Sequence, residues 1–199
     1  MRRIRRRARR RKAHLIFLDE SGFQLRPLVR RTLAPRGETP VLPCWDRRDR
    51  LSAISCISLS PVRDHPGLYF DLLPVDANVT AVEVVAFLQD LKRHLPGPWV
   101  LLWDRHRIHS RARAVKVWLA KHPEVAVEDF PAYAPELNPD EMVWGYTKYH
   151  QLANFAPADT WELRIRLIGE LVELQRRPAL LRAFIKHAGL PLRLRSPPH

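Results

Sequence analysis

Five short apolar runs, and the spacing between them, constrain the fold of this chain more than any other feature. The runs are too short for helices and are bounded by turn or charged residues, so they predict strands at residues 14–18, 51–59, 68–73, 99–103 and 125–130. No helical pattern separates the first three. Apolar residues at helical spacing in residues 79–95, and an amphipathic pattern in residues 111–122, separate the later strands. The chain is therefore predicted to be α/β.

The order of these elements predicts a mixed sheet. Three strands without intervening helices form an antiparallel meander, whereas strands that arrive through a helix run parallel to the first strand. The result is the ribonuclease H-like topology, a mixed five-stranded sheet flanked by helices, with the first and fourth strands adjacent in mid-sheet. We expect this domain over residues 13–156. A C-terminal helical extension over residues 157–189 and a disordered tail over residues 190–199 should follow.

Two of the predicted strands end abruptly in an acid. Asp19 follows the first strand and Asp104 the fourth. Because these strands are parallel neighbours, both carboxylates should lie side by side at one edge of the sheet. A third carboxylate, Glu141, lies in the first turn of a helix that Asn138 caps and Pro139 begins. That helix follows the fifth strand and should bring Glu141 over the same edge.

Each acid also has a simpler interpretation when it is taken alone. Glu141 has the spacing of a capping box and would then reach back to the amide of Asn138. Asp19 would be a solvated residue at a turn, and Asp104 would form a surface ion pair beside Arg105. The arrival of all three acids at one corner of a single topology favours a shared site.

Three carboxylates at close range point to magnesium or a similarly hard cation. Mg²⁺ takes oxygen ligands, and two such ions clamp the attacking and leaving oxygens of a phosphoryl displacement. We predict a site for two Mg²⁺ or Mn²⁺ ions, in which Asp19 bridges both while Asp104 and Glu141 each complete one. Without a cation the three negative charges should repel one another, so that one acid holds a proton or the site stays loose.

The net charge of +13 comes mostly from one end of the chain. Residues 2–12 hold nine cations and no acid, and the remaining 25 basic and 21 acidic residues leave a balance of +4. This basic arm, residues 1–12, shows no apolar periodicity. We therefore expect it to be disordered and to bind the phosphates of nucleic acid.

Composition excludes several classes of protein. The apolar run over residues 15–18 is too short for a signal peptide, and no run approaches the length of a membrane span. Cys44 and Cys56 stand alone, without the spacing of a zinc site, and favour a reducing compartment. We expect a cytoplasmic protein with no membrane partner.

Four sequence blocks resemble the catalytic core of mariner-like DDE transposases, in the bacterial insertion-sequence branch. They are residues 19–23 (Asp-Glu-Ser-Gly-Phe), 34–40 (Ala-Pro-Arg-Gly-Glu-Thr-Pro), 103–104 (Trp-Asp, with His109 five residues on) and 134–144 (Ala-Pro-Glu-Leu-Asn-Pro-Asp-Glu-Met-Val-Trp). Asp104 and Glu141 are separated by 36 residues, close to the spacing in that family. The resemblance covers about residues 13–156, and its Asn-Pro-x-Glu block is the most specific part.

By this resemblance, Asp19, Asp104 and Glu141 would be the metal-binding triad, and the reaction would be DNA strand cleavage followed by strand transfer. The partners would be the DNA of the element ends and of the target, with a homodimer acting on them. The family carries helix-turn-helix domains ahead of this core, so a separately encoded helix-turn-helix partner is expected. The alternatives are a truncated, catalytically inactive nucleic-acid-binding remnant, and a ribonuclease H-like nuclease without strand transfer.

Seven residues are candidates for contact with nucleic acid: Arg36, Trp45, Arg47, Arg48, Arg105, His109 and Lys148. Trp45 lies in a basic loop over residues 26–50, where it would stack on DNA or anchor the loop. Arg105 stands where the family commonly has a small residue or Asn, and would touch a phosphate or mark a decayed copy. His109 would orient a carboxylate or contact the scissile phosphate, or else cap the helix at Arg111. The other tryptophans of the apolar runs are expected in the core.

Overall fold

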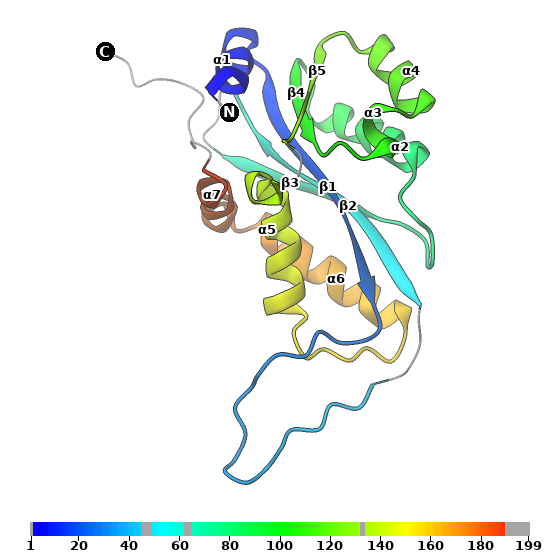
Figure 1. Ribbon diagram of the computed structural model, residues 1–199, viewed down its shortest axis with the longest axis vertical. Coiled ribbons are helices and arrows are strands. Elements are labelled where there is room, and N and C mark those ends of the chain that lie inside the picture. The colour runs from blue at the N-terminus through cyan, green and yellow to red at the C-terminus, as the bar shows by residue number, and fades with distance from the viewer. Residues whose placement is uncertain (1, 45–48, 62–64, 132–133, 190–199) are drawn as a thin grey trace, which may run out of the picture.

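The computed structural model describes residues 2–44, 49–61, 65–131 and 134–189. At its centre lies a five-stranded sheet in the order β3-β2-β1-β4-β5, with helices on both faces (Figure 1). The strands are β1 (His14–Gln24), β2 (Arg50–Leu59), β3 (Pro66–Leu72), β4 (Trp99–Trp103) and β5 (Val125–Asp129). The first three pair antiparallel, whereas β4 runs parallel to β1 and β5 parallel to β4. The predicted mixed, ribonuclease H-like sheet is confirmed.

The helices form two layers, one on each face of the sheet (Figure 1). One layer consists of α2 (Ala81–His94), α3 (Arg107–Ser110) and α4 (Arg113–Lys121). The other consists of α5 (Pro139–Tyr146), α6 (Thr160–Gln175) and α7 (Pro178–His187). Two short turns flank α5: the 3-10 turn η1 (Pro135–Leu137) precedes it, and the π-helical turn η2 (Thr147–Gln151) follows it.

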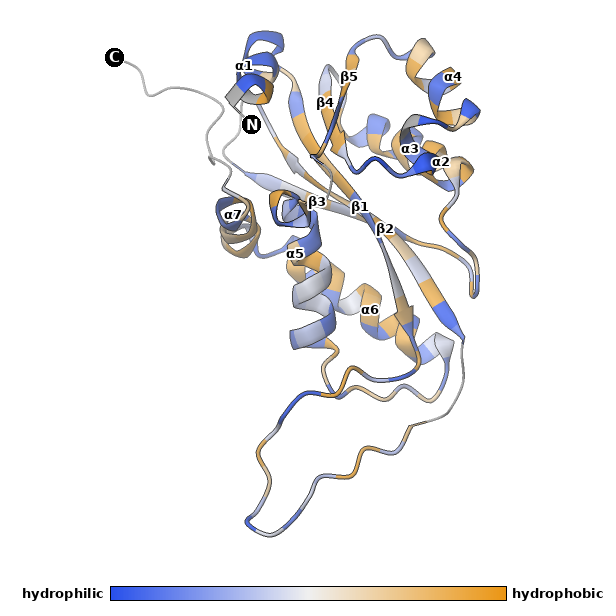
Figure 2. Cartoon of the chain, in the orientation of Figure 1, coloured by the Kyte–Doolittle hydropathy of each residue, from blue (hydrophilic) through white to orange (hydrophobic). Residues whose placement is uncertain are grey.

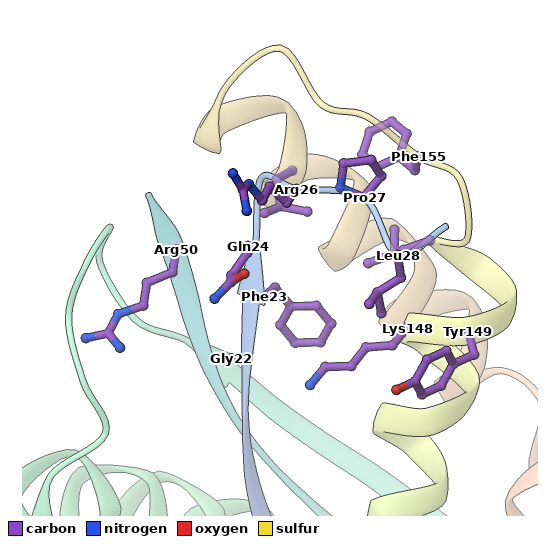
Figure 3. Close-up of a pocket in the computed structure, with 12 residues that line it drawn as sticks. Gly22, Phe23, Gln24, Arg26, Pro27, Leu28, Arg50, Lys148, Tyr149 and Phe155 are labelled. Carbon is purple, nitrogen blue, oxygen red and sulfur yellow. The ribbon is translucent and has the colours of Figure 1, made fainter. Parts of the chain in front are cut away.

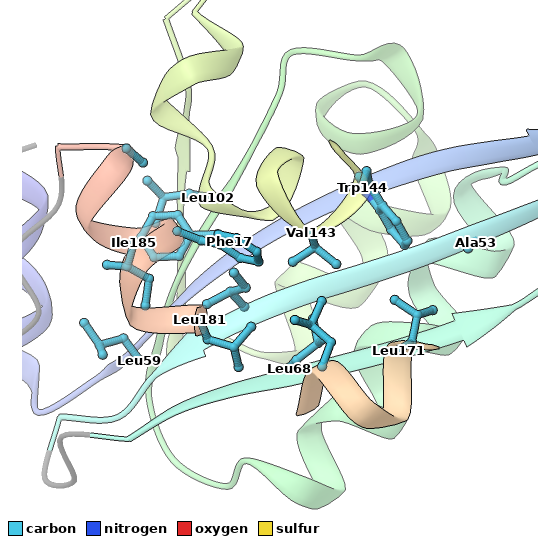
Figure 4. Close-up of a cluster of buried hydrophobic side chains, with 14 of the residues drawn as sticks. Phe17, Ala53, Leu59, Leu68, Leu102, Val143, Trp144, Leu171, Leu181 and Ile185 are labelled. Carbon is cyan, nitrogen blue, oxygen red and sulfur yellow. The ribbon is translucent and has the colours of Figure 1, made fainter. Parts of the chain in front are cut away.

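Strand alternation divides the core between these two layers. On β1, Leu15 and Phe17 belong to the cluster under α5, α6 and α7 (Figure 4), whereas Ile16 and Leu18 belong to the cluster under α2 and α4. Both faces are covered, and β4 and the part of β1 over residues 15–18 are accordingly hydrophobic without interruption (Figure 2). The tryptophans expected in the core are buried there: Trp99, Trp103, Trp118 and Trp144.

The C-terminal helices complete one face of the sheet. Leu163, Leu167 and Leu171 of α6 and Leu181 and Ile185 of α7 are buried in the same cluster as β1 and β2. Full burial of one such side chain contributes about 1.5–3 kcal/mol. In addition, the guanidinium of Arg164 donates hydrogen bonds to the carbonyls of Leu72 and Leu73 at the end of β3. The helical extension is thus part of the core that supports the sheet.

Two elements differ from their predicted bounds. We expected the first strand to end at residue 18, but β1 continues to Gln24 because β2 remains its antiparallel partner as far as the pair Gln24–Arg50. The helix expected over residues 111–122 is α4, which begins only at Arg113 because Ala112 adopts an extended backbone conformation, and the short helix α3 before it was not predicted.

The basic arm is not disordered in the structure. It forms the helix α1 (Arg2–Arg11), which is largely hydrophilic (Figure 2) but buries Ile4 and Ala8 against the core. These two residues are four apart and therefore share one face of the helix. Arg3 and Arg7, also four apart, each donate a hydrogen bond of 2.7 Å to the carboxylate of Glu128 on β5. The prediction of disorder was based on the charge and on the lack of apolar periodicity, and it did not consider that Ile4 and Ala8 share one face of a helix or that Glu128 lies beside it.

A long loop connects β1 to β2 and extends away from the sheet (Figure 1). Its first residues are fixed to the loop after η2, because the amide of Asn154 donates to the carbonyl of Leu28 and the amide of Arg30 donates to Asn154 Oδ1. Arg36 is exposed in this loop, and the predicted DNA contacts Trp45, Arg47 and Arg48 lie outside the described residues. In the described part of the chain, the helices are all too short or too polar to span a membrane.

Candidate active site

The register of β1 and β4 brings Asp19 and Asp104 together just beyond the last pair of their parallel ladder. The parallel pairs run from His14–Trp99 to Phe17–Leu102, and continuing them by two residues places Asp19 opposite Asp104. Phe17 and Leu102 lie in the cluster under α5, so alternation places Asp19 on this same face of the sheet. The parallel pairing expected from the sequence therefore positions both acids at one edge.

The start of α5 is anchored directly over this edge. Asn138 caps the helix, since its Oδ1 accepts a hydrogen bond from the amide of Asp140, and its Nδ2 donates to the carbonyl of Leu18, one residue before Asp19. The carboxylate of Asp140 is fully buried and accepts a hydrogen bond of 2.6 Å from Ser55 Oγ. Ser55 in turn pairs with Asp19 across the β1–β2 ladder. These contacts position the first turn of α5, which carries Glu141.

Asp19, Asp104 and Glu141 line one pocket of about 590 Å³, together with Asn138, Arg105 and His106 among others. The structure thus brings together the three acids that the sequence singled out. Within the described residues, no group of three or more His, Cys, Asp or Glu side chains could hold a metal ion as it stands.

Two acids of this pocket have raised pKa values. Burial raises the pKa of Asp19 to about 8, and the negative charges of Glu141, Glu20 and Asp104 add to the effect. Burial also raises the pKa of Glu141, with a contribution from Asp104, while the ammonium of Lys148 opposes the rise. Raised pKa values mean that this pocket favours added positive charge, either as protons or as a cation.

A buried histidine connects two strands beside the pocket. His109 on α3 is 1% exposed, and its ring stacks on the indole of Trp103 with 4.8 Å between ring centroids. Nδ1 lies 2.7 Å from Asp104 Oδ1, and Nε2 lies 2.6 Å from Glu20 Oε1. Burial by itself lowers the pKa of His109, but the hydrogen bonds and charges of Asp104 and Glu20 outweigh burial and raise the pKa to about 10.

His109 is therefore an imidazolium that donates a hydrogen bond to each of two acids. Its hydrogen bond lowers the pKa of Asp104, in contrast to the raised pKa of Asp19. Of the roles considered for His109, orienting a carboxylate agrees with these contacts, and capping a helix at Arg111 does not, because His109 lies inside α3. The sequence reasoning did not identify Glu20 as a site residue. Alternation along β1 places its side chain on the face opposite to that of Asp19, where it contacts His109.

Lys148 and Arg105 place positive charge beside the acids. Lys148, on the π-helical turn after α5, is half-buried, and its Nζ lies 5.1 Å from the centre of the Phe23 ring (Figure 3). Burial lowers the pKa of Lys148, while the charges of Glu141 and Asp19 counteract this. Its side chain also lines a neighbouring pocket of about 300 Å³ with Arg26 and Arg50. Arg105 is exposed at the rim of the acidic pocket.

The strand order and the helices on both faces of the sheet define a ribonuclease H-like fold, as in transposase catalytic cores. A family model described as DDE superfamily endonuclease matches residues 14–164. The chain belongs to this family. A comparison with curated protein sequences finds no match.

Solved structures of Mos1 transposase share the fold. The Mos1 mariner paired-end complex with Mg superposes with a TM-score of 0.64 at 17% sequence identity, covering 95% of this chain and 61% of that one. The corresponding complex with Mn gives a TM-score of 0.62 at 18% identity, over 94% and 58% of the two chains. The catalytic domain of Mos1 mariner transposase gives 0.52 at 16% identity, over 96% and 90%. The chain thus spans about three fifths of the Mos1 chains in the paired-end complexes.

Proposed function

We propose that this chain is the catalytic domain of a mariner-like DDE transposase of the bacterial insertion-sequence branch, which cleaves DNA strands and transfers them to a target. The observation that carries the proposal is the pocket shared by Asp19, Asp104 and Glu141. These acids come from β1, β4 and α5, which are separated in sequence and converge only through the ribonuclease H-like topology.

The donor set of the pocket suits two Mg²⁺ or Mn²⁺ ions. Carboxylate oxygens are the ligands these hard cations prefer, and the raised pKa values of Asp19 and Glu141 support a site that takes up positive charge. Asp19, central in the sheet, would bridge both ions, with Asp104 and Glu141 completing one each. Bound ions of this kind polarise a phosphate and activate the attacking oxygen. The Mos1 mariner paired-end complexes with Mg and with Mn agree with this choice.

The cations around the pocket suit a DNA substrate. Lys148 and Arg105 flank the three acids, and we propose that they contact phosphates next to the cleaved one. The long loop with Arg36, Trp45, Arg47 and Arg48 would contact DNA or a second copy of the chain. The protein would act as a homodimer on DNA in the cytoplasm. A separately encoded helix-turn-helix partner is part of this proposal and would recognise the element ends.

Nicking and joining assays test this function. Incubation with supercoiled plasmid and a labelled oligonucleotide duplex in Mn²⁺ should yield nicked plasmid and labelled, joined products. Asp104→Asn should abolish both products, whereas Glu136→Gln, which removes an exposed acid next to the pocket-lining Pro135, should retain them. Nicking without joined product would favour a nuclease without strand transfer. Absence of both products from the wild-type chain would favour an inactive remnant.

A further inference from the structure

Adjacent acids on β1 serve opposite faces of the sheet. Asp19 shares the α5 face with Glu141, and Glu20 faces the layer of α2, α3 and α4. Glu20 therefore contacts His109 on α3, and it is not among the residues that line the pocket of Asp19, Asp104 and Glu141. Its side chain is 18% exposed, so an unpaired charge there would be costly. Its position implies a role in holding His109 rather than in direct binding.

Asp104 needs an external support for its orientation. It follows the last residue of β4, and its side chain is 58% exposed, so neither a ladder nor packing fixes its carboxylate. Hydrogen bonds from His109 Nδ1 and from the amide of His106 both reach the same oxygen, Oδ1, at 2.7 and 2.9 Å. They hold the plane of the carboxylate and leave Oδ2 as the oxygen for a cation.

His109 is suited to transmit a constraint from Glu20 to Asp104. Its ring lies almost parallel to the indole of Trp103, with 8° between the planes, so rotation out of this plane is blocked on one side. The hydrogen bond to Glu20 then fixes rotation within the plane, because it holds Nε2 at 2.6 Å. With both motions restricted, Nδ1 can only point at Asp104.

We propose that Glu20 is a positioning residue of the active site: acting through His109, it holds the carboxylate of Asp104 in the orientation that binds a divalent cation. This inference rests on the proposed function, since it assumes that Asp104 is a metal ligand. In metal sites generally, a carboxylate that fixes a histidine contributes about 10- to 100-fold to metal affinity although it does not touch the metal. Here the order is different, because the histidine fixes the ligand and the carboxylate fixes the histidine.

The test measures the dissociation constant for Mn²⁺ from the signal of free Mn²⁺ in electron paramagnetic resonance. Glu20→Gln keeps the shape of the side chain but weakens the hydrogen bond to Nε2, and should raise the dissociation constant about 10-fold. At position 109, an Asn amide nitrogen stands near Nδ1 and can still reach Asp104, whereas a Gln amide nitrogen stands near Nε2 and reaches only Glu20. His109→Gln should therefore weaken Mn²⁺ binding more than His109→Asn.

A double-mutant cycle decides whether Glu20 acts through His109. In the His109→Asn background the link to Glu20 is already lost, so adding Glu20→Gln should change Mn²⁺ affinity no further. Glu136→Gln removes the same charge near the pocket without touching His109, and should leave the dissociation constant within about twofold of the wild type. Melting temperatures recorded by circular dichroism confirm that each variant is folded.

Several results would overturn the inference. Unchanged Mn²⁺ affinity in Glu20→Gln, with or without a lower melting temperature, would show a purely structural role. An equal loss in the wild-type and His109→Asn backgrounds would show that Glu20 acts on the metal by another route. Either of these two results defeats only the role of Glu20 if wild type binds Mn²⁺ and Asp104→Asn does not. The proposed function then still stands. If wild type does not bind Mn²⁺ at all, the proposed function fails and the inference fails with it.

Discussion

The two faces of β1 at Asp19 and Glu20 differ in whether a positive side chain neutralises their carboxylates. On the α5 face, Asp19 and Glu141 face each other in a pocket and the pKa of both is raised. On the α3 face, Glu20 and Asp104 share the imidazolium of His109, and the pKa of Asp104 is lowered. Asp19 and Glu20 are neighbours on β1, but only the acids on the side of Glu20 are neutralised by His109.

This difference teaches where the protein supplies its own cation and where it requires an external one. A buried histidine between two carboxylates is a fixed part of the fold, because Trp103 and two hydrogen bonds hold it in place. The acids of the α5 face have Lys148 nearby, but their raised pKa values show that it does not balance them. The α3 face therefore balances its own charge, whereas the α5 face would need an external cation.

The largest expected effect is on catalysis and comes from the uncompensated face. Glu141→Gln keeps the shape of the side chain but removes a charged ligand, and should lower the rate of Mn²⁺-dependent plasmid nicking about a thousand-fold or more, because metal stabilisation of the transition state is worth several kcal/mol. Glu136→Gln is the matched control. Nicking by Glu141→Gln at the wild-type rate would show that Glu141 is not a catalytic ligand.

The next effect is on stability and comes from the compensated face. His109→Ala removes the shared cation and leaves Glu20 without its partner, which should lower the free energy of unfolding by about 3 kcal/mol in urea titrations at pH 7. The neighbouring His106 is exposed, so His106→Ala should cost no more than about 0.5 kcal/mol. Equal effects of the two substitutions would show that the bridge is not a structural element.

A third prediction separates the faces by pH. Because the pKa of Asp19 is about 8 in the folded chain and about 4 when unfolded, the folded state binds more protons between these values. Without metal, stability should therefore fall as pH rises from about 4 to about 8, by about 2 kcal/mol after allowance for solvent screening. The stabilising charge of His109 is lost at higher pH, as the pH rises from about 6.5 towards about 10.

Urea titrations of wild type and Asp19→Asn from pH 5 to pH 8 measure this difference. The decline between pH 5 and about pH 6.5 should disappear in Asp19→Asn, while the loss above about pH 6.5 that depends on His109 should remain. A wild-type profile that rises between pH 5 and pH 8 would contradict the raised pKa of Asp19.

The smallest expected effect is stabilisation by metal. If the dissociation constant for Mg²⁺ is about 1 mM, 10 mM Mg²⁺ should add roughly 1.4 kcal/mol to the free energy of unfolding. Asp104→Asn should lose this increment and retain the folded core, since its side chain is mostly exposed. The measurement is the shift in melting temperature with and without Mg²⁺. The same shift in wild type and variant would place the cation elsewhere.

Much of the fold was predictable because its signals are local. The five apolar runs gave the strands, the missing helix between the first three gave the antiparallel part, and Asn138 with Pro139 marked the start of α5. The three acids followed from the same reasoning, since parallel strands present the same ends at one edge. β1 was predicted too short because its last residues depend on pairing with β2, which no local signal reports.

Other features were decided by contacts between residues far apart in the chain. Glu20 meets His109 across 89 positions, and Ser55 meets the buried Asp140 across 85. The arm is a helix because Ile4 and Ala8 pack against the core and because Arg3 and Arg7 donate hydrogen bonds to Glu128. Its charge count had predicted disorder.

The sequence by itself determined where the apolar run of each strand lies, which acids follow two of these runs, and where α5 begins, since period, length and capping act over a few neighbouring residues. The tertiary structure alone decided which acids are compensated. That outcome depends on which face of β1 each side chain occupies and on what the opposite layer places there. A shift of one residue in strand register would exchange the two faces, and with them the roles of Asp19 and Glu20.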